Sequence, residues 1–118
     1  MSQSGGLKDI SKQLQAFANE RDWQQFHSPK NLAMALNVEA GELLEHFQWL
    51  TEESSAELDA DKLAKVSKEI ADVQIYLIRL ADQLGVDILA ATEAKMAENE
   101  MKYPADAVRG SAKKYTEY

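Results

Sequence analysis

Four acidic residues in two pairs of equal spacing are the side chains in this sequence best able to do chemistry. Glu39 and Glu42 form the first pair, and Glu69 and Asp72 form the second. Side chains three residues apart lie on one face of a helix, so each pair presents two carboxylates in the same direction. Two antiparallel helices could bring all four together. Oxygen-only ligands suit a hard cation, Mg²⁺ or alternatively Mn²⁺, and argue against zinc.

The position of Glu39 relative to the apolar residues is unusual. At about 100° per residue, Glu39 falls on the apolar stripe that contains Leu36 and Leu43, and Glu42 flanks that stripe. A carboxylate directed into a core is strongly unfavourable unless it is paired or bound to a metal. The residues alone leave two interpretations open: a metal site, or a core network of salt bridges with lysine or arginine. A di-iron bundle is set aside because it requires Glu-x-x-His pairs, which the sequence lacks.

The elements that would position these carboxylates are helices. Apolar residues recur at intervals of three and four, and no stretch alternates as a strand would. Ser28 can cap a helix that has Pro29 in its first position, Gly85 is suited to ending one, and Asp87 can cap the next. The spacing predicts helices over residues 7–17, 29–50, 63–84 and 88–101, with a surface connection over residues 51–61.

We therefore expect an all-α, four-helix-bundle-like domain over residues 1–118, in which residues 1–6 are flexible and residues 104–118 form a C-terminal tail. Around residues 70–81 the third helix is apolar on nearly every side, with Ile75 and Ile78 directed away from Val73 and Leu77. A helix of this kind must be covered on nearly every side. We expect a homo-oligomer, either a dimer or a tetramer built as a dimer of dimers.

Charge and composition exclude several classes of partner. The net charge of −7 repels nucleic acid, and no basic groove or recognition helix is evident, so no nucleic-acid partner is expected. No apolar run approaches the roughly 18 residues of a membrane span. The first residues lack the pattern of a signal peptide, and cysteine is absent. The expectation is a soluble, cytoplasmic protein without membrane contact.

The sequence resembles the MazG-like superfamily of all-α nucleotide pyrophosphohydrolases, and within it the dCTP pyrophosphatase branch. The shared motif, Glu-x-x-Glu followed after a spacer by Glu-x-x-Asp, stands here at residues 39–42 and 69–72. The resemblance extends over roughly residues 10–118. Further matching segments are Arg21–Leu32, Phe47-Gln48-Trp49, Asp72–Leu77, Lys95-Met96 with Asn99, Lys102-Tyr103-Pro104 and Ala112–Glu117.

This resemblance implies a magnesium-dependent enzyme that hydrolyses a nucleoside triphosphate, dCTP or a related deoxypyrimidine nucleotide, to the monophosphate and pyrophosphate. It implies that all four carboxylates bind the metal, while Glu39 or Glu42 activates the attacking water. Where some family members carry a histidine that lines the base pocket, this chain has Leu14, which leaves the base preference open. The expected substrate-binding residues are Trp23 and Trp49 at the base, Tyr76 at the deoxyribose, His27 and Asn31 beside a helix start, and Lys95, Asn99, Lys102 and Arg109 at the phosphates.

Simpler interpretations stand beside these. The tryptophans could be ordinary core, the basic C-terminal quarter a solvated tail, and His27 a structural residue. A different substrate, such as dUTP or phosphoribosyl-ATP, would keep the chemistry. The main alternative is a non-catalytic, acidic helical oligomer that binds a nucleotide or a partner helix.

Overall fold

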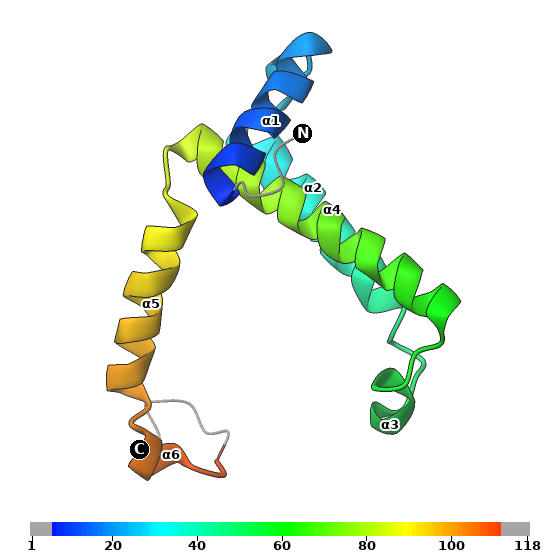
Figure 1. Cartoon of the computed structure of the whole chain (residues 1–118), viewed down its shortest axis with the longest axis vertical. Helices are drawn as coiled ribbons and strands as arrows, with labels where there is room; N and C mark the ends of the chain where they lie inside the picture. Colours follow the sequence, from blue (N-terminus) through cyan, green and yellow to red (C-terminus); the bar gives the residue numbers. More distant parts are fainter. Residues whose placement is uncertain (1–5, 112–118) are drawn as a thin grey trace. The chain divides into compact units, whose positions relative to one another are not determined.

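The computed structural model describes residues 6–111, and all regular structure in this range is helical. This confirms the predicted all-α class. None of the helices in the described range is both long and apolar enough to span a bilayer. The elements are α1 (Leu7–Glu20), a 3-10 turn η1 (Gln24–Phe26), α2 (Pro29–Glu45), α3 (Glu52–Ser55), α4 (Ala60–Leu84), α5 (Ile88–Lys102) and α6 (Ala105–Val108), shown in Figure 1.

Local hydrogen bonds explain where the long helices begin and end. The Oγ of Ser28 accepts the backbone N–H of Asn31 at 3.1 Å, which caps α2 as predicted. Asp59 caps α4 and Asp87 caps α5 in the same way, each accepting the N–H three residues ahead. Gly85 ends α4 with φ at 69°, in the left-handed conformation that glycine adopts without steric penalty. These ends are set by sequence-local rules.

The structure differs from the predicted helix pattern in three segments. The second helix was expected to reach Leu50, but α2 ends at Glu45, because His46 and Phe47 donate to carbonyls only three residues back and the chain tightens into turns. The surface connection contains α3, which Thr51 and Ser54 stabilise through a capping box. The expected C-terminal tail begins with the short helix α6. Its last part, residues 112–118, lies outside the described range.

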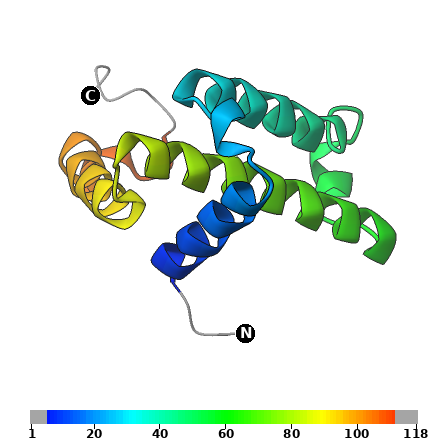
Figure 2. The same ribbon diagram turned by 90° about the horizontal axis from the view of Figure 1, so that it is seen from above.

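The chain divides between Val86 and Asp87 into two compact units, the second of which contains α5 and α6. In the first unit, α2 and α4 lie side by side and antiparallel and form the main helix pair, while α1 packs across α4 (Figures 1 and 2). Each helix bearing carboxylates thus packs against the other. The buried apolar residues of the described range are Ala18, Leu32, Val66, Ile78 and Ala81.

The exposed apolar surface of α4 agrees only in part with the prediction. Of the two residues expected to point away from Val73 and Leu77, Ile78 is only 3% exposed because its own chain covers it, whereas Ile75 is 37% exposed. The other large apolar residues of α4 that remain exposed, at 44–56%, are Leu63, Ile70, Leu77 and Leu84. These last four recur every seven residues and so lie along one side of the helix. We call these four residues the α4 stripe.

The contrasting conformations of two glycines give a test of this backbone. A Cβ added at Gly85 or at Gly41 would meet nothing within 4 Å, so the two sites differ only in conformation. Gly85→Ala should lower the free energy of unfolding by about 1 kcal/mol, because a left-handed alanine is strained. Gly41→Ala, within helix α2, should raise it by about 0.5–1 kcal/mol. Urea unfolding at one fixed protein concentration measures both, and shifts of the same sign would contradict the assigned conformations.

Candidate metal centre

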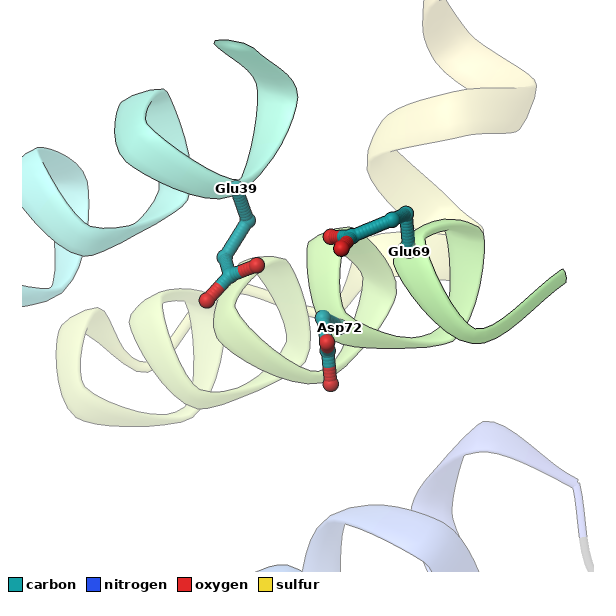
Figure 3. A group of neighbouring side chains, drawn as sticks. All are labelled: Glu39, Glu69 and Asp72. Atoms are coloured by element: carbon teal, nitrogen blue, oxygen red, sulfur yellow. The ribbon is translucent and has the colours of Figure 1, made fainter. Parts of the chain in front are cut away.

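Three of the four predicted carboxylates come together between α2 and α4. Glu39 projects from α2, and Glu69 and Asp72 project from α4, one turn apart (Figure 3). One oxygen of each side chain lies within 4.8 Å of the others. The antiparallel packing of the two helices and the three-residue spacing on α4 together produce this convergence. The arrangement is a compact cluster of hard oxygen ligands.

Within residues 6–111, no protein cation compensates the charge of this cluster. All three side chains are half-buried, and within the described residues the Oε2 atoms of Glu39 and Glu69 are buried without a hydrogen-bond partner. No lysine or arginine between residues 6 and 111 forms an ion pair with any of the three. A salt-bridge network, the alternative that the sequence left open, is therefore absent from this part of the chain.

The electrostatic consequence appears at Glu39. Burial, followed by the adjacent carboxyl of Glu42, raises the pKa of Glu39 from its ordinary 4.5 to about 7. Asp72 and Glu69 add smaller contributions in the same direction. Near neutral pH Glu39 is thus only partly ionised, and a divalent cation could replace the proton that it retains. Orphaned buried oxygens and an all-carboxylate donor set fit Mg²⁺ or Mn²⁺.

Glu42 occupies a different position from the other three. It is half-buried and close enough to Glu39 to perturb the pKa of that residue, but it does not belong to the group whose oxygens converge within 4.8 Å. Its carboxylate therefore borders the cluster from the α2 side. The predicted quartet is a group of three with a fourth acid next to it.

The aromatic candidates lie at helix ends or on the site's own helix. Trp49 follows the end of α2 and is 88% exposed, so it is not part of a core within this chain. Trp23 precedes η1, is about half exposed and packs edge-on against Phe17 with ring centroids 5.7 Å apart. Tyr76 is half-buried on α4, one turn after Asp72. Both tryptophans leave ring surface accessible for a ligand.

His27 and Asn31 make structural hydrogen bonds at the start of α2. The side-chain amide of Asn31 donates to the carbonyl of Phe26 at 3.0 Å, so it holds the preceding turn. The ring Nδ1 of His27 lies 3.3 Å from a guanidinium nitrogen of Arg79. Arg79 is a buried cation in the apolar part of α4 that sequence analysis did not single out, although a lone charge in such a stretch was a usable signal.

The phosphate-binding candidates all belong to the second unit. Lys95 and Lys102 on α5 both pair with Glu98, at 3.5 and 2.9 Å. These lysines lower the pKa of Glu98, chiefly through its hydrogen bond with Lys102, so the carboxylate stays ionised. Asn99 is exposed on α5, and Arg109 pairs with Asp106 at 3.5 Å.

Comparison with known proteins places the chain in a family. Residues 34–118 match the model of the MazG-like family. Human dCTP pyrophosphatase 1 is 45% identical over 113 residues, covering 94% of this chain and 66% of the human protein, and the rat protein of the same name is 44% identical. A pyrophosphatase from Archaeoglobus fulgidus superposes with a TM-score of 0.80 at 36% identity, covering 88% of this chain and 97% of the archaeal one.

The chain belongs to the MazG-like family, which confirms the resemblance drawn from residues 39–42 and 69–72. It spans 66% of the length of the human and mouse relatives.

The raised pKa of Glu39 predicts a specific pH dependence of stability without metal. Because the folded protein binds this proton more tightly than the unfolded chain, the contribution of Glu39 is most favourable below about pH 4.5 and is lost as the pH rises through about 7. Glu39→Gln cannot titrate at this position. The thermal midpoint of the variant minus that of the wild type should therefore increase as the pH rises from 5 to 8.

Glu45→Gln, an exposed substitution on the same helix, is the matched control and should follow the wild type. Added Mg²⁺ should restore the wild-type midpoint at pH 8 but leave Glu39→Gln little changed. Parallel pH profiles for the wild type and Glu39→Gln in chelator would contradict the crowded cluster.

Proposed function

We propose that this chain is a Mg²⁺-dependent nucleoside triphosphate pyrophosphohydrolase, which converts dCTP or a related deoxypyrimidine triphosphate to the monophosphate and pyrophosphate. The observation that carries the proposal is the convergence of Glu39, Glu69 and Asp72, which no lysine or arginine among the described residues pairs with, in a member of the MazG-like family. The 45% identity to human dCTP pyrophosphatase 1 supports the base assignment. Leu14, where some family members have a histidine, leaves room for a different base.

The acidic residues would hold the metal and prepare the water. Glu39, Glu69 and Asp72 would bind Mg²⁺ or Mn²⁺, with Glu42 completing the set from its position next to Glu39. When bound, the cation supplies positive charge that neutralises phosphate oxygens, as divalent ions do in other phosphoryl-transfer sites. Without it, these carboxylates would repel a triphosphate.

Glu39 and Glu42 are the candidates for activating the attacking water. The reaction breaks the anhydride between the α- and β-phosphates, and a water oxygen ends on the monophosphate when pyrophosphate leaves. Glu39 lies inside the cluster, whereas Glu42 borders it and lies outside the group of converging oxygens. We therefore favour Glu42 as the group that orients this water and accepts its proton, with Glu39 as the alternative.

The remaining predicted residues would bind the nucleotide. The accessible rings of Trp23 and Trp49 are suited to stacking on a base, and Tyr76, one turn after Asp72, would pack against the deoxyribose and disfavour a 2′-hydroxyl. His27 and Asn31 would line the same region. The phosphate-binding candidates on the second unit are Lys95, Asn99, Lys102 and Arg109.

A panel of deoxynucleoside triphosphates tests this function directly. Pyrophosphate release should require Mg²⁺ and be fastest with a deoxypyrimidine nucleotide. Glu39→Gln should reduce turnover at least about a hundredfold, because it removes a carboxylate that holds the reacting groups. Glu45→Gln on the exposed face of α2 should retain wild-type turnover. Equal turnover in Glu39→Gln would refute the centre, and nucleotide binding without release of pyrophosphate would favour the non-catalytic alternative.

We further propose that the chain functions as a homo-oligomer, a dimer or a dimer of dimers. The support is the α4 stripe, whose four aliphatic side chains are each about half exposed although the described residues bury few apolar side chains. Several exposed apolar residues along one side of a helix are typical of a surface that another protein covers. Self-association through a symmetric contact is the commonest solution.

Adding a charge to the α4 stripe tests the oligomer. Leu77→Glu should shift the solution mass toward the 13.2 kDa of one chain, because a charge in an apolar contact is left unpaired. Ala64→Glu adds the same charge at an exposed position on another side of α4, about 100° or more around the helix from the stripe, and should leave the mass unchanged. Light scattering after size exclusion measures both. A wild-type protein with the mass of a single chain would contradict the proposal.

A further inference from the structure

Arg79 on α4 is a buried cation that the chemistry proposed above does not use. It is 3% exposed, and a guanidinium in such a place is unfavourable unless its donors are satisfied. One terminal nitrogen donates to Asp82 at 3.1 Å, on the same helix, and the other lies 3.3 Å from Nδ1 of His27. A salt bridge to Asp82 alone would not require burial. The contact with His27 is the part that links distant segments.

This contact defines the chemical state of His27. A guanidinium can only donate hydrogen bonds, so Nδ1 must be the acceptor and must carry no proton. The single ring proton of the neutral imidazole is then on Nε2. Burial, followed by the positive charge of Arg79, lowers the pKa of His27 and keeps the ring neutral. In the described part of the chain, Nε2 has no hydrogen-bond partner of its own.

A second contact holds the backbone of the same residue. The side-chain amide of Gln83, one turn after Arg79, donates to the carbonyl oxygen of His27 at 3.1 Å. Both the ring and the backbone of His27 are therefore fixed by the same face of α4. His27 directly precedes Ser28, the cap of α2, and follows η1, which begins after Trp23. The imidazole is thus rigidly placed in the segment that carries other nucleotide-binding candidates.

We propose that Arg79 is a positioning residue that fixes His27 as a neutral Nε2–H donor, and that this N–H binds an acceptor atom on the nucleoside part of the triphosphate. A neutral donor contributes no charge against phosphates, which cationic side chains bind better. It is suited instead to a neutral acceptor such as a base carbonyl oxygen. The contact with the nucleoside rests on the proposed function, whereas the tautomer of His27 rests only on its contact with Arg79.

The ring state can be read without any enzymatic activity. Long-range proton–nitrogen spectra of the full chain resolve the imidazoles, and the chain has two histidines, so His46→Asn assigns the signals of His27. At pH 7 the wild type should show a bare Nδ1 and a protonated Nε2. Arg79→Met should convert this spectrum to that of exchanging tautomers. A proton on Nδ1 or a charged imidazolium in the wild type would overturn the assignment, whatever the fate of the variant.

The substrate contact is tested by comparing binding of the whole nucleotide, measured as KM, with binding of its phosphate part alone, measured as inhibition by inorganic pyrophosphate. His27→Leu removes the donor, whereas the amide of His27→Gln offers an N–H near the place of Nε2. His27→Leu and Arg79→Met should each raise KM for the best nucleotide about tenfold and leave kcat within about twofold of the wild type. In His27→Gln, KM should stay within about threefold of the wild-type value. Inhibition by inorganic pyrophosphate should be unchanged in all three.

The outcomes that would contradict the nucleoside contact differ from those that would contradict the proposed function. Equal losses in His27→Leu and His27→Gln, or weaker inhibition by pyrophosphate, would overturn the contact with the nucleoside and leave His27 a structural residue. Absence of turnover with every nucleotide would overturn the proposed function, and this contact with it. The spectrum of the wild-type ring would still decide whether Arg79 fixes the tautomer.

Discussion

The mutual repulsion of Glu39, Glu69 and Asp72 is the constraint on which the rest of this structure depends. Their oxygens converge between two helices that pack over a small core, and in the described residues no protein cation offsets them. The free energy of folding must therefore absorb this crowding, part of it by keeping a proton on the cluster, as the raised pKa of Glu39 indicates. A site that is unfavourable when empty is well suited to binding a divalent cation.

Helix α4 makes three separate sets of contacts, which explains its unusual sequence. Glu69 and Asp72 point toward α2, Arg79, two turns after Asp72, holds the connection before α2, and the α4 stripe remains about half exposed. The near-continuous apolar character of residues 70–81 reflects these separate packing demands. Of the two residues that the sequence singled out as pointing away from Val73 and Leu77, Ile75 stays exposed and Ile78 is covered by its own chain.

The parts of the structure that sequence could predict are those set by local or periodic rules. The cap at Ser28 and the left-handed stop at Gly85 depend on neighbouring residues, and the inward direction of Glu39 follows from helical periodicity. The contact between His27 and Arg79 joins residues 52 positions apart, so no local pattern encodes it. The place of Glu42 beside the cluster depends in the same way on how α2 and α4 pack.

Glu98 and a bound triphosphate would compete for the same two lysines, because Lys95 and Lys102 already pair with Glu98. The side chains of Lys95 and Glu98 are more than half exposed and that of Lys102 is partly exposed, and ion pairs that water reaches contribute little to stability because water screens them. A triphosphate carries more negative charge than one carboxylate, so it can displace Glu98 at a small energetic penalty. Pairing with Glu98 is therefore compatible with the proposed phosphate-binding role, and it prevents an uncompensated cluster of cations when no nucleotide is bound.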